Sequence, residues 1–158
     1  MSAPRPPSPG AGLEKAQRAL AQATRALAGS RRLEVSFGPA VPGVATGNSA
    51  RLPPFKLPLA ASEAARLRGI ADHVALRHAY HDPALHARFR PTGSRAREIY
   101  DAVEDMRCQA LGANALPGVA HNLTEALVDQ ISRKTGAPPY GGRPSPMTQA
   151  LALLVREQ

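Results

Sequence analysis

The sequence predicts a mainly α-helical protein, a helical bundle with a small two-stranded β element near its N-terminus. Apolar residues recur at intervals of three or four over most of the chain after residue 13, which is the period of amphipathic helices. Only residues 33–37 alternate apolar and polar side chains as a half-buried strand does. Hydrophobic residues make up 43% of the 158, yet there are only 3 Phe, 3 Tyr and no Trp. We therefore expect stability to depend on close helix packing or on a partner.

Two regions are expected along the chain. Residues 1–12 contain four prolines and lack the apolar centre of a signal peptide, so they predict a disordered Pro-rich tail. Residues 13–158 are expected to form a single, mainly helical domain.

The N-terminal part of this domain is expected to combine one helix with two strands. A helix over residues 13–28 ends at Gly29, and residues 33–37 follow as a strand. Residues 51–54 are expected to pair with that strand at an edge position, because two prolines in this segment cannot donate hydrogen bonds to a central strand.

Two helices are predicted next. Ser62 is expected to cap a helix that runs through residue 80, and Asp82 with Pro83 starts a short helix that reaches residue 89. The inward stripe of the longer helix consists of Leu67, Ile70, Ala71, Val74 and His78.

Three further helices are predicted over residues 94–111, 117–134 and 145–158, separated by Gly112 and by a Gly- and Pro-rich segment. The apolar face of the first, which we expect to point inward, consists of Ala96, Ile99, Val103, Met106 and Ala110. The corresponding faces of the other two are Val119, Leu123, Leu127 and Ile131, and then Met147, Leu151, Leu154 and Val155.

Basic side chains concentrate in the first third of the chain. The whole sequence has 20 basic and 12 acidic residues, and residues 1–60 carry eight of the former and two of the latter. Such a surplus attracts polyanions or acidic proteins, although a merely solvated surface would look the same. The candidate partner-binding residues are Arg18, Arg25, Arg31 and Arg32. We expect no nucleic-acid partner, because aromatic residues that stack on bases are few and are not interleaved with Arg.

Composition excludes several classes of protein. No run of about 18 apolar residues exists, which argues against a membrane span. The single cysteine, Cys108, excludes a disulfide framework and a zinc cluster built on thiolates, and we expect it to be a buried, inert thiol. The sequence lacks a phosphate-binding loop with its Lys and Ser/Thr, so autonomous ATP binding is not expected. A cytoplasmic location is expected.

Histidines gather in residues 78–86. On a helix His78 and His81 share a face, so both imidazoles could reach one metal ion, with Asp82 or His86 completing its coordination. Glu104 of the next long helix would join them if its side chain turned toward the histidines. The candidate metal ligands are therefore His78, His81, His86 and Glu104. In the competing interpretation, Asp82 is a helix cap and the histidines are hydrogen-bonded groups at a helix junction.

A second charged group lies at Asp101, Glu104, Asp105 and Arg107. Glu104 and Arg107 are three residues apart, which predicts an ion pair on the helix surface worth a few tenths of a kcal/mol if exposed. No catalytic residue is predicted here or elsewhere in the chain.

Residues 33–123 as a whole resemble the N-terminal region of the CobT subunit of the aerobic, ATP-dependent cobaltochelatase. The matching pieces begin with Leu33-Glu34-Val35-Ser36-Phe37, Arg51-Leu52-Pro53, Arg68-Gly69-Ile70-Ala71-Asp72, Ala75-Leu76-Arg77, His81-Asp82 and Leu85-His86. They continue with Asp101-Ala102-Val103-Glu104, Arg107, Ala110-Leu111-Gly112, Gly118-Val119-Ala120 and Asn122-Leu123. From these pieces the motif residues are Arg68, Asp72, His81, Asp82, His86, Glu104, Arg107, Gly112 and Asn122.

The resemblance implies a part in inserting cobalt into hydrogenobyrinic acid a,c-diamide during cobalamin biosynthesis. Its implied partners are an AAA+ ATPase subunit and a large corrin-binding subunit, with ATP, magnesium and cobalt belonging to the complex and no cofactor bound by this chain. The von Willebrand factor A domain of the family is absent from this sequence. Gln109, Ala113 and Asn114 also depart from the charged residues usual in the family.

These observations favour a non-catalytic assembly module of a chelatase, which is a metal-inserting ligase. Two alternatives stay open: a degenerate zinc-metallohydrolase-like domain, in which the histidines and Glu104 would surround a metal ion, and a small basic nucleic-acid-binding protein.

Overall fold

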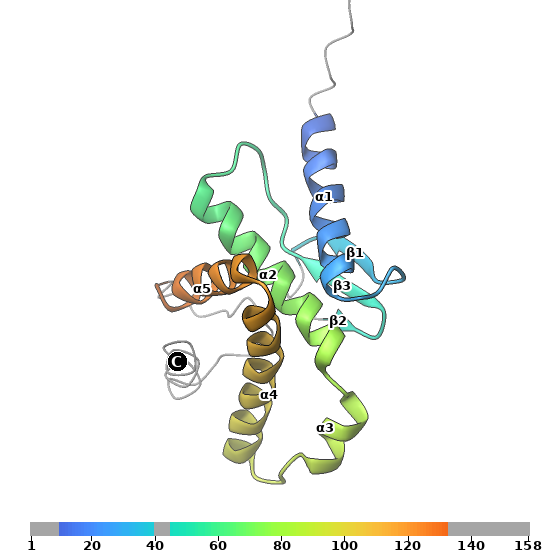
Figure 1. The fold of residues 1–158 in the computed structure, drawn as a ribbon, viewed down its shortest axis with the longest axis vertical. Coiled ribbons are helices and arrows are strands. Elements are labelled where there is room, and N and C mark those ends of the chain that lie inside the picture. Colours follow the sequence, from blue (N-terminus) through green and yellow to red (C-terminus); the bar gives the residue numbers. More distant parts are fainter. Residues whose placement is uncertain (1–9, 40–44, 133–158) are drawn as a thin grey trace, which may run out of the picture.

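A computed structural model describes residues 10–39 and 45–132 of the 158-residue chain. Within these residues it contains helices and a small sheet, arranged as in Figure 1. In chain order they are α1 (Ala11–Leu27), β1 (Glu34–Phe37), β2 (Ala45–Thr46), β3 (Ser49–Leu52), α2 (Ala61–Tyr80), α3 (Pro83–Phe89), α4 (Ser94–Ala115) and α5 (Pro117–Ser132). The predicted helical fold with a β element near the N-terminus is confirmed. Of the tail expected over residues 1–12, residues 1–9 lie outside the described residues. The expected boundary at residue 12 is wrong, because α1 begins at Ala11. The expected helix over residues 145–158 also lies outside the described residues.

The sheet has the strand order β1-β3-β2. The two expected strands do pair, and they run parallel, with Val35 opposite Ala50 and Phe37 opposite Leu52. The expected edge position of the second strand is wrong, because β2 adds to its other side in antiparallel orientation. β3 can be central because it ends at Leu52, immediately before the prolines that would interrupt its hydrogen bonds.

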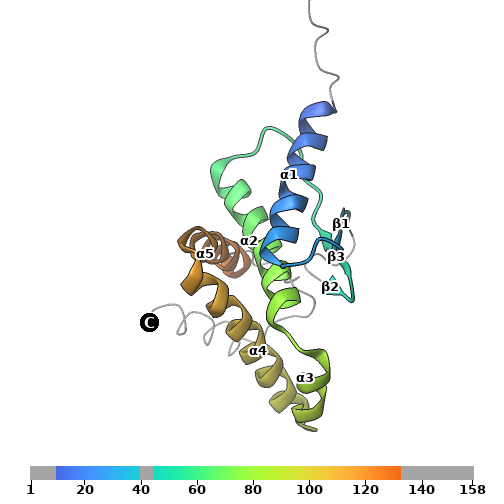
Figure 2. The same cartoon turned by 45° about the vertical axis from the view of Figure 1, so that its right-hand side comes forward.

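Helix α2 is the centre of the fold and lies between α1 with the sheet on one side and α4 with α5 on the other (Figures 1 and 2). Leu67, Ile70, Ala71 and Val74 of the expected stripe are buried, as predicted, whereas His78 is only partly buried. Neighbours on several sides also bury residues away from that stripe, including Ala75 and Leu76. The expected cap at Ser62 is wrong: the N-cap lies two residues earlier, at Ala60, whose backbone N–H donates to Glu63 Oε2 at 3.3 Å.

One hydrophobic core joins α2 to the sheet and α1. Its buried members are Ala28, Leu33, Ala50, Leu52, Ile70, Ala71, Val74 and Ala75. A second cluster of Leu76, Val119 and Leu123 joins α2 to α5. Four of the eight residues in the first cluster belong to α2. The other four lie in the segment between the end of α1 and the end of β3, which carries the strands, so the small sheet forms one wall of the core.

Two glycines allow neighbouring helices to approach α2 closely. A Cβ at Gly69 would lie 2.1 Å from the backbone oxygen of Asn122 and 2.7 Å from Ala126 Cβ, both on α5. A Cβ at Gly112 of α4 would lie 2.2 Å from a methyl carbon of Leu76. Distances this short are not accessible to any larger residue without movement, so both contacts require glycine.

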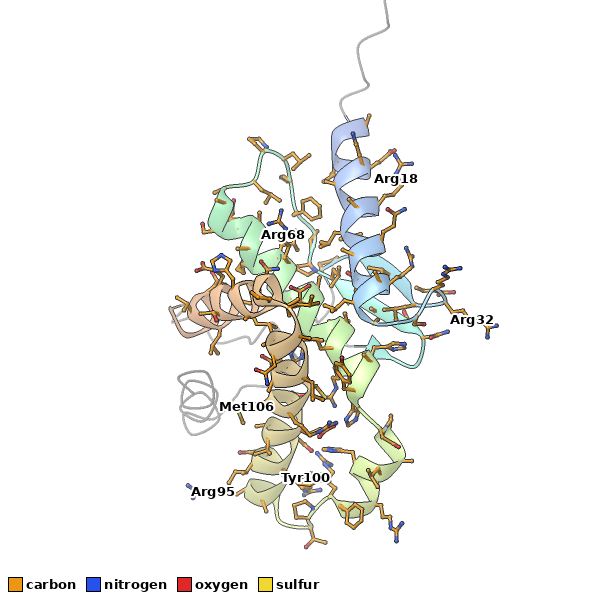
Figure 3. The ribbon with its side chains drawn as sticks, in the orientation of Figure 1. Arg18, Arg32, Arg68, Arg95, Tyr100 and Met106 are labelled. Carbon is orange, nitrogen blue, oxygen red and sulfur yellow. The ribbon has the colours of Figure 1, made fainter. Side chains whose placement is uncertain are left out.

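The expected orientation of α4 is wrong. Its buried residues are Cys108 and Gly112, whereas Val103, at the centre of the face expected to point inward, is 48% exposed. Met106 of the same face lies on the side of α4 away from α3 (Figure 3). The helix instead turns its acidic residues toward α2 and α3, because Arg77, His81 and His86 of those helices and of the corner between them present nitrogen partners to it.

Among residues 10–39 and 45–132, no helix combines the length and the apolar character that crossing a bilayer requires.

Replacing Gly69 by Ala is predicted to lower the free energy of unfolding by about 3 kcal/mol, because the added Cβ meets the backbone of α5 rather than a flexible side chain. Gly118→Ala is the matched control, since a Cβ there has no heavy atom within 4 Å, and we expect it to be neutral or slightly stabilising. Urea denaturation of the two variants measures the difference. Equal stability of the two would contradict the close α2–α5 contact.

Candidate functional site

The corner between α2 and α3 brings two histidines together. His81 is the C-cap of α2, and Asp82 caps α3 because its Oδ1 accepts hydrogen bonds from the backbone N–H groups of Ala84 and Leu85 at 2.9 Å each. The predicted role of Asp82 as a helix cap is thus confirmed. The corner places the rings of His81 and His86 edge to face, with their centroids 4.9 Å apart.

Three carboxylates of α4 face this corner and the end of α2. Asp101 lies three residues before Glu104 and four before Asp105, so all three lie on one side of the helix, and we call them the acidic row. Each carboxylate has a nitrogen partner from α2 or α3. The pairs are Arg77 with Asp105, His81 Nδ1 with Glu104 Oε1 at 2.9 Å, and His86 Nε2 with Asp101 Oδ1 at 2.8 Å.

Glu104 is held from two directions. Arg107 Nε donates to its Oε2 and Arg107 Nη2 to its Oε1, both at 2.8 Å, which confirms the predicted ion pair. Arg107 Nη2 also donates to the backbone oxygen of Tyr80 at 2.7 Å and so fastens α4 to the end of α2. The hydrogen bonds from Arg107, and then that from His81, lower the pKa of Glu104 to about 2, although partial burial opposes them.

Asp101 and His86 form a second pair beside that of Glu104 and His81. Arg90 Nε donates to Asp101 Oδ1 at 3.0 Å, and a second guanidinium nitrogen binds Oδ2. These contacts from Arg90, followed by the one from His86, lower the pKa of Asp101. The Tyr100 ring stacks on the His86 ring at a centroid distance of 4.6 Å, and its hydroxyl donates to the His86 backbone oxygen at 3.4 Å.

Cys108 lies behind this cluster and is 1% exposed. Burial, and then the nearby carboxylate of Glu104, raise the pKa of the thiol to about 11. The thiol is therefore protonated at neutral pH, as expected of an inert cysteine.

A cavity of about 430 Å³ lies on the opposite side of α2, between α1, α5 and the segment that leads from the sheet to α2. Most of the cavity wall is apolar, and polar side chains line one part of it. The lining residues are Ala16, Ala19, Leu20, Ala23, Thr24, Phe55, Leu59, Ala64, Leu67, Arg68, Asp72 and Asn122. Four of these are alanines of α1 or α2 whose small side chains leave the space open.

Asp72 is the partly buried acid that lines this cavity. Asn122 Nδ2 donates to its Oδ2 at 2.8 Å, a contact that links α2 to α5. Burial raises the pKa of Asp72 to about 6, although the hydrogen bond from Asn122 and the charge of Arg68 oppose the increase.

The structure groups the motif residues into two places and one packing contact. Arg68, Asp72 and Asn122 line the cavity, while His81, Asp82, His86, Glu104 and Arg107 form the junction of α2, α3 and α4. Gly112 is a close-packing position. Of the four candidate metal ligands, His81, His86 and Glu104 converge, with one ligand atom of each within 4.8 Å of the others, and His78 is not in that group.

Arg90 and Tyr100 belong to the junction but are absent from the residues predicted for it. The contact of each with Asp101 or His86 spans ten or more residues and a helix corner, so helical spacing could not reveal it. Gln109, which departs from the family pattern, places its amide nitrogen 3.0 Å from Nδ1 of the buried His73.

The candidate partner-binding arginines occupy two different environments. Arg18, Arg31 and Arg32 are exposed, and Figure 3 shows Arg18 and Arg32 projecting from the outer side of α1 and of the turn after it. Arg25 is partly buried, and its Nε donates to the Leu33 backbone oxygen at 2.7 Å. Arg25 therefore stabilises the connection between α1 and β1.

The contribution of Asp72 to the free energy of unfolding is predicted to fall as the pH rises from about 4 to about 6, whereas Glu104, with its lowered pKa, acts in the opposite direction up to about pH 4.5. Folded Asp72 keeps its proton up to a pKa of about 6, whereas the unfolded chain releases it near 3.8, so the folded state binds more protons in this window. Asp72→Asn keeps the acceptor for Asn122 and should remove this slope, with a gain of at most about 3 kcal/mol at pH 7.5. Thermal denaturation across the range checks this, and Glu14→Gln on the exposed side of α1 is the control that should keep the slope.

The comparison with known protein families gives one match. The family described as cobalamin biosynthesis protein CobT matches residues 11–158, which is all but the first ten residues. No solved structure matches the chain. The match spans both groups of motif residues, the cavity and the junction. This chain belongs to the CobT family of cobalamin biosynthesis proteins.

Proposed function

We propose that this chain is a subunit or assembly module of an ATP-dependent cobaltochelatase, which inserts cobalt into hydrogenobyrinic acid a,c-diamide. Its membership in the CobT family, whose role is in cobalamin biosynthesis, carries the proposal. In this proposal the AAA+ ATPase subunit and the large corrin-binding subunit are the partners. ATP, magnesium and the cobalt substrate are handled by the complex.

The arrangement of reactive groups supports a role in assembly rather than in catalysis. In the part of the chain that the structure describes, the carboxylates of the acidic row are paired with an arginine and two histidines across helices, and the thiol is buried and protonated. Such pairs hold helices together, and their carboxylates have hydrogen-bond partners already. The cavity beside Asp72 is lined mainly by alanine and leucine side chains.

A basic surface on α1 and the following turn is the proposed contact with the ATPase subunit. We define this basic surface by Arg18, Arg31 and Arg32, which are exposed, and we leave out Arg25 because it binds Leu33 within the fold. Exposed guanidinium groups attract an acidic partner surface and accelerate encounter, and salt screens the attraction.

The direct experiment is co-purification of this chain with the AAA+ ATPase subunit encoded by the same genome, followed by a cobalt-insertion assay with and without the chain. We expect a complex, and we expect cobalt insertion to require the chain. Insertion at an unchanged rate in its absence would overturn the proposal.

Electrostatic docking through the basic surface predicts salt-sensitive association. We expect the Kd for the ATPase subunit to weaken at least tenfold between about 50 and 500 mM salt, because the Debye length falls to a few ångströms. Arg18→Glu/Arg32→Glu should weaken binding at low salt by a similar factor. Arg88→Glu/Arg95→Glu is the matched control, since it changes net charge equally with exposed arginines of α3 and α4.

Isothermal titration of the ATPase subunit with the unchanged chain and with each of the two double variants measures the Kd and distinguishes the possible results. Equal loss of affinity in both double variants would show that net charge alone matters, and equal affinity at the two salt concentrations would exclude electrostatic docking. Either result would remove the basic surface from the proposal, while the insertion assay would still test the role of the chain.

A further inference from the structure

We infer that the junction of α2, α3 and α4 is a binding site for one divalent transition-metal ion, held by His81, His86 and Glu104. The inference does not depend on the proposed chelatase role, and it concerns a resident ion rather than the cobalt that the complex would insert. It follows from where these three side chains lie, from their donor atoms, and from the hydrogen bonds that orient Glu104.

The three donors come from three separate elements and are largely shielded from water. His81 caps α2, His86 lies on α3 and Glu104 on α4, and their side chains are 11%, 13% and 16% exposed. One ligand atom of each lies within 4.8 Å of the other two. Ligands of a tetrahedral ion with bonds of about 2.0–2.1 Å are about 3.3 Å apart, so small side-chain movements would complete the site.

The donor set selects a class of metal ion. Two imidazole nitrogens with one carboxylate oxygen suit Zn²⁺ and Co²⁺, whereas Mg²⁺ and Ca²⁺ prefer ligands that are all oxygen. Three protein ligands leave a fourth position for a water molecule.

The ion pair with Arg107 is compatible with metal binding. Glu104 Oε1, which faces His81 Nδ1 at 2.9 Å, would bind the ion, while Arg107 Nε would keep its contact with Oε2. Arg107 Nη2, released from Oε1, retains the backbone oxygen of Tyr80 as an acceptor at 2.7 Å. Arg107 would thus orient the carboxylate from behind, as outer hydrogen bonds commonly do at metal sites.

The same arginine sets a limit on affinity. The charges of Asp101 and Glu104 are already balanced by Arg90 and Arg107, so the protein offers no net negative charge to a dication. We therefore expect reversible binding with a Kd of about 100 µM or tighter, weaker than in structural zinc sites.

The test is titration of Co²⁺ into the full chain, purified without a histidine tag and stripped of metal with a chelator. We expect one Co²⁺ per chain and the intense visible absorption bands of a tetrahedral ion, displaced by Zn²⁺. Calorimetric titration with Zn²⁺ gives an independent stoichiometry.

Variants assign the ligands. His81→Ala and His86→Ala should each weaken binding at least about tenfold and abolish the tetrahedral bands. His121→Ala, at an exposed position on α5, and His78→Ala, one turn before His81, are the matched controls and should leave binding unchanged. His81→Gln and His86→Gln serve if the alanine variants do not fold by circular dichroism.

Three results would overturn the inference. The first is the absence of binding up to about 1 mM Co²⁺, a concentration that corresponds to a binding free energy of only about −4 kcal/mol. The second is an absorption spectrum typical of six-coordinate Co²⁺. The third is a loss of binding in His78→Ala or His121→Ala equal to that in the ligand variants. A loss of chelatase assembly in a variant that binds Co²⁺ normally would concern the proposed function alone.

Discussion

The acidic row of α4 is the constraint on which the arrangement of the C-terminal half depends. Asp101, Glu104 and Asp105 face α2 and α3, where a carboxylate loses part of its hydration and needs hydrogen-bond partners in its place. The need is greatest for Glu104, whose side chain is 16% exposed, against 37% for Asp101 and 31% for Asp105. α2 and α3 supply those partners as Arg77, His81 and His86. The orientation of α4 about its own axis is therefore set by charge pairing rather than by its apolar face.

The other helices are held in place by close backbone packing, whereas α4 is oriented by its charge pairs. Large side chains are scarce in this sequence, so buried area has to come from short distances between helices. Gly69 brings α2 against α5, and Gly112 lets the Leu76 side chain lie against α4. Ala16, Ala19 and Ala23 of α1 and Ala64 of α2 line the cavity beside Asp72. α2 thus makes close glycine contacts with α4 and α5, and it borders the cavity on the side of α1.

Local features of the fold could be predicted from the sequence because they depend on residues close together in the chain. The period of apolar residues located the helices to within a few residues, and Asp82 with Pro83 marked the start of α3. The resemblance to the CobT family identified residues that the structure gathers at the cavity and at the junction. The pairing of Glu104 with Arg107 followed from their spacing of three.

Features that depend on distant residues could not be predicted. The rule that an apolar face points inward placed Val103 in the core, and it failed because the partners of the acidic row lie more than ten residues away. The parallel pairing of β1 with β3 needs a crossover that includes β2, a strand of only two residues with no pattern of its own. The contacts of Gly69 and Gly112 depend on where other helices lie, which the identity of a glycine does not reveal.

The exposure of Val103 and Leu111 has a consequence for how α4 meets its surroundings. In the folded chain the carboxylates of α4 already have partners on α2 and α3. The exposed Val103 and Leu111 side chains are therefore the part of this helix where added burial would remove apolar surface from water.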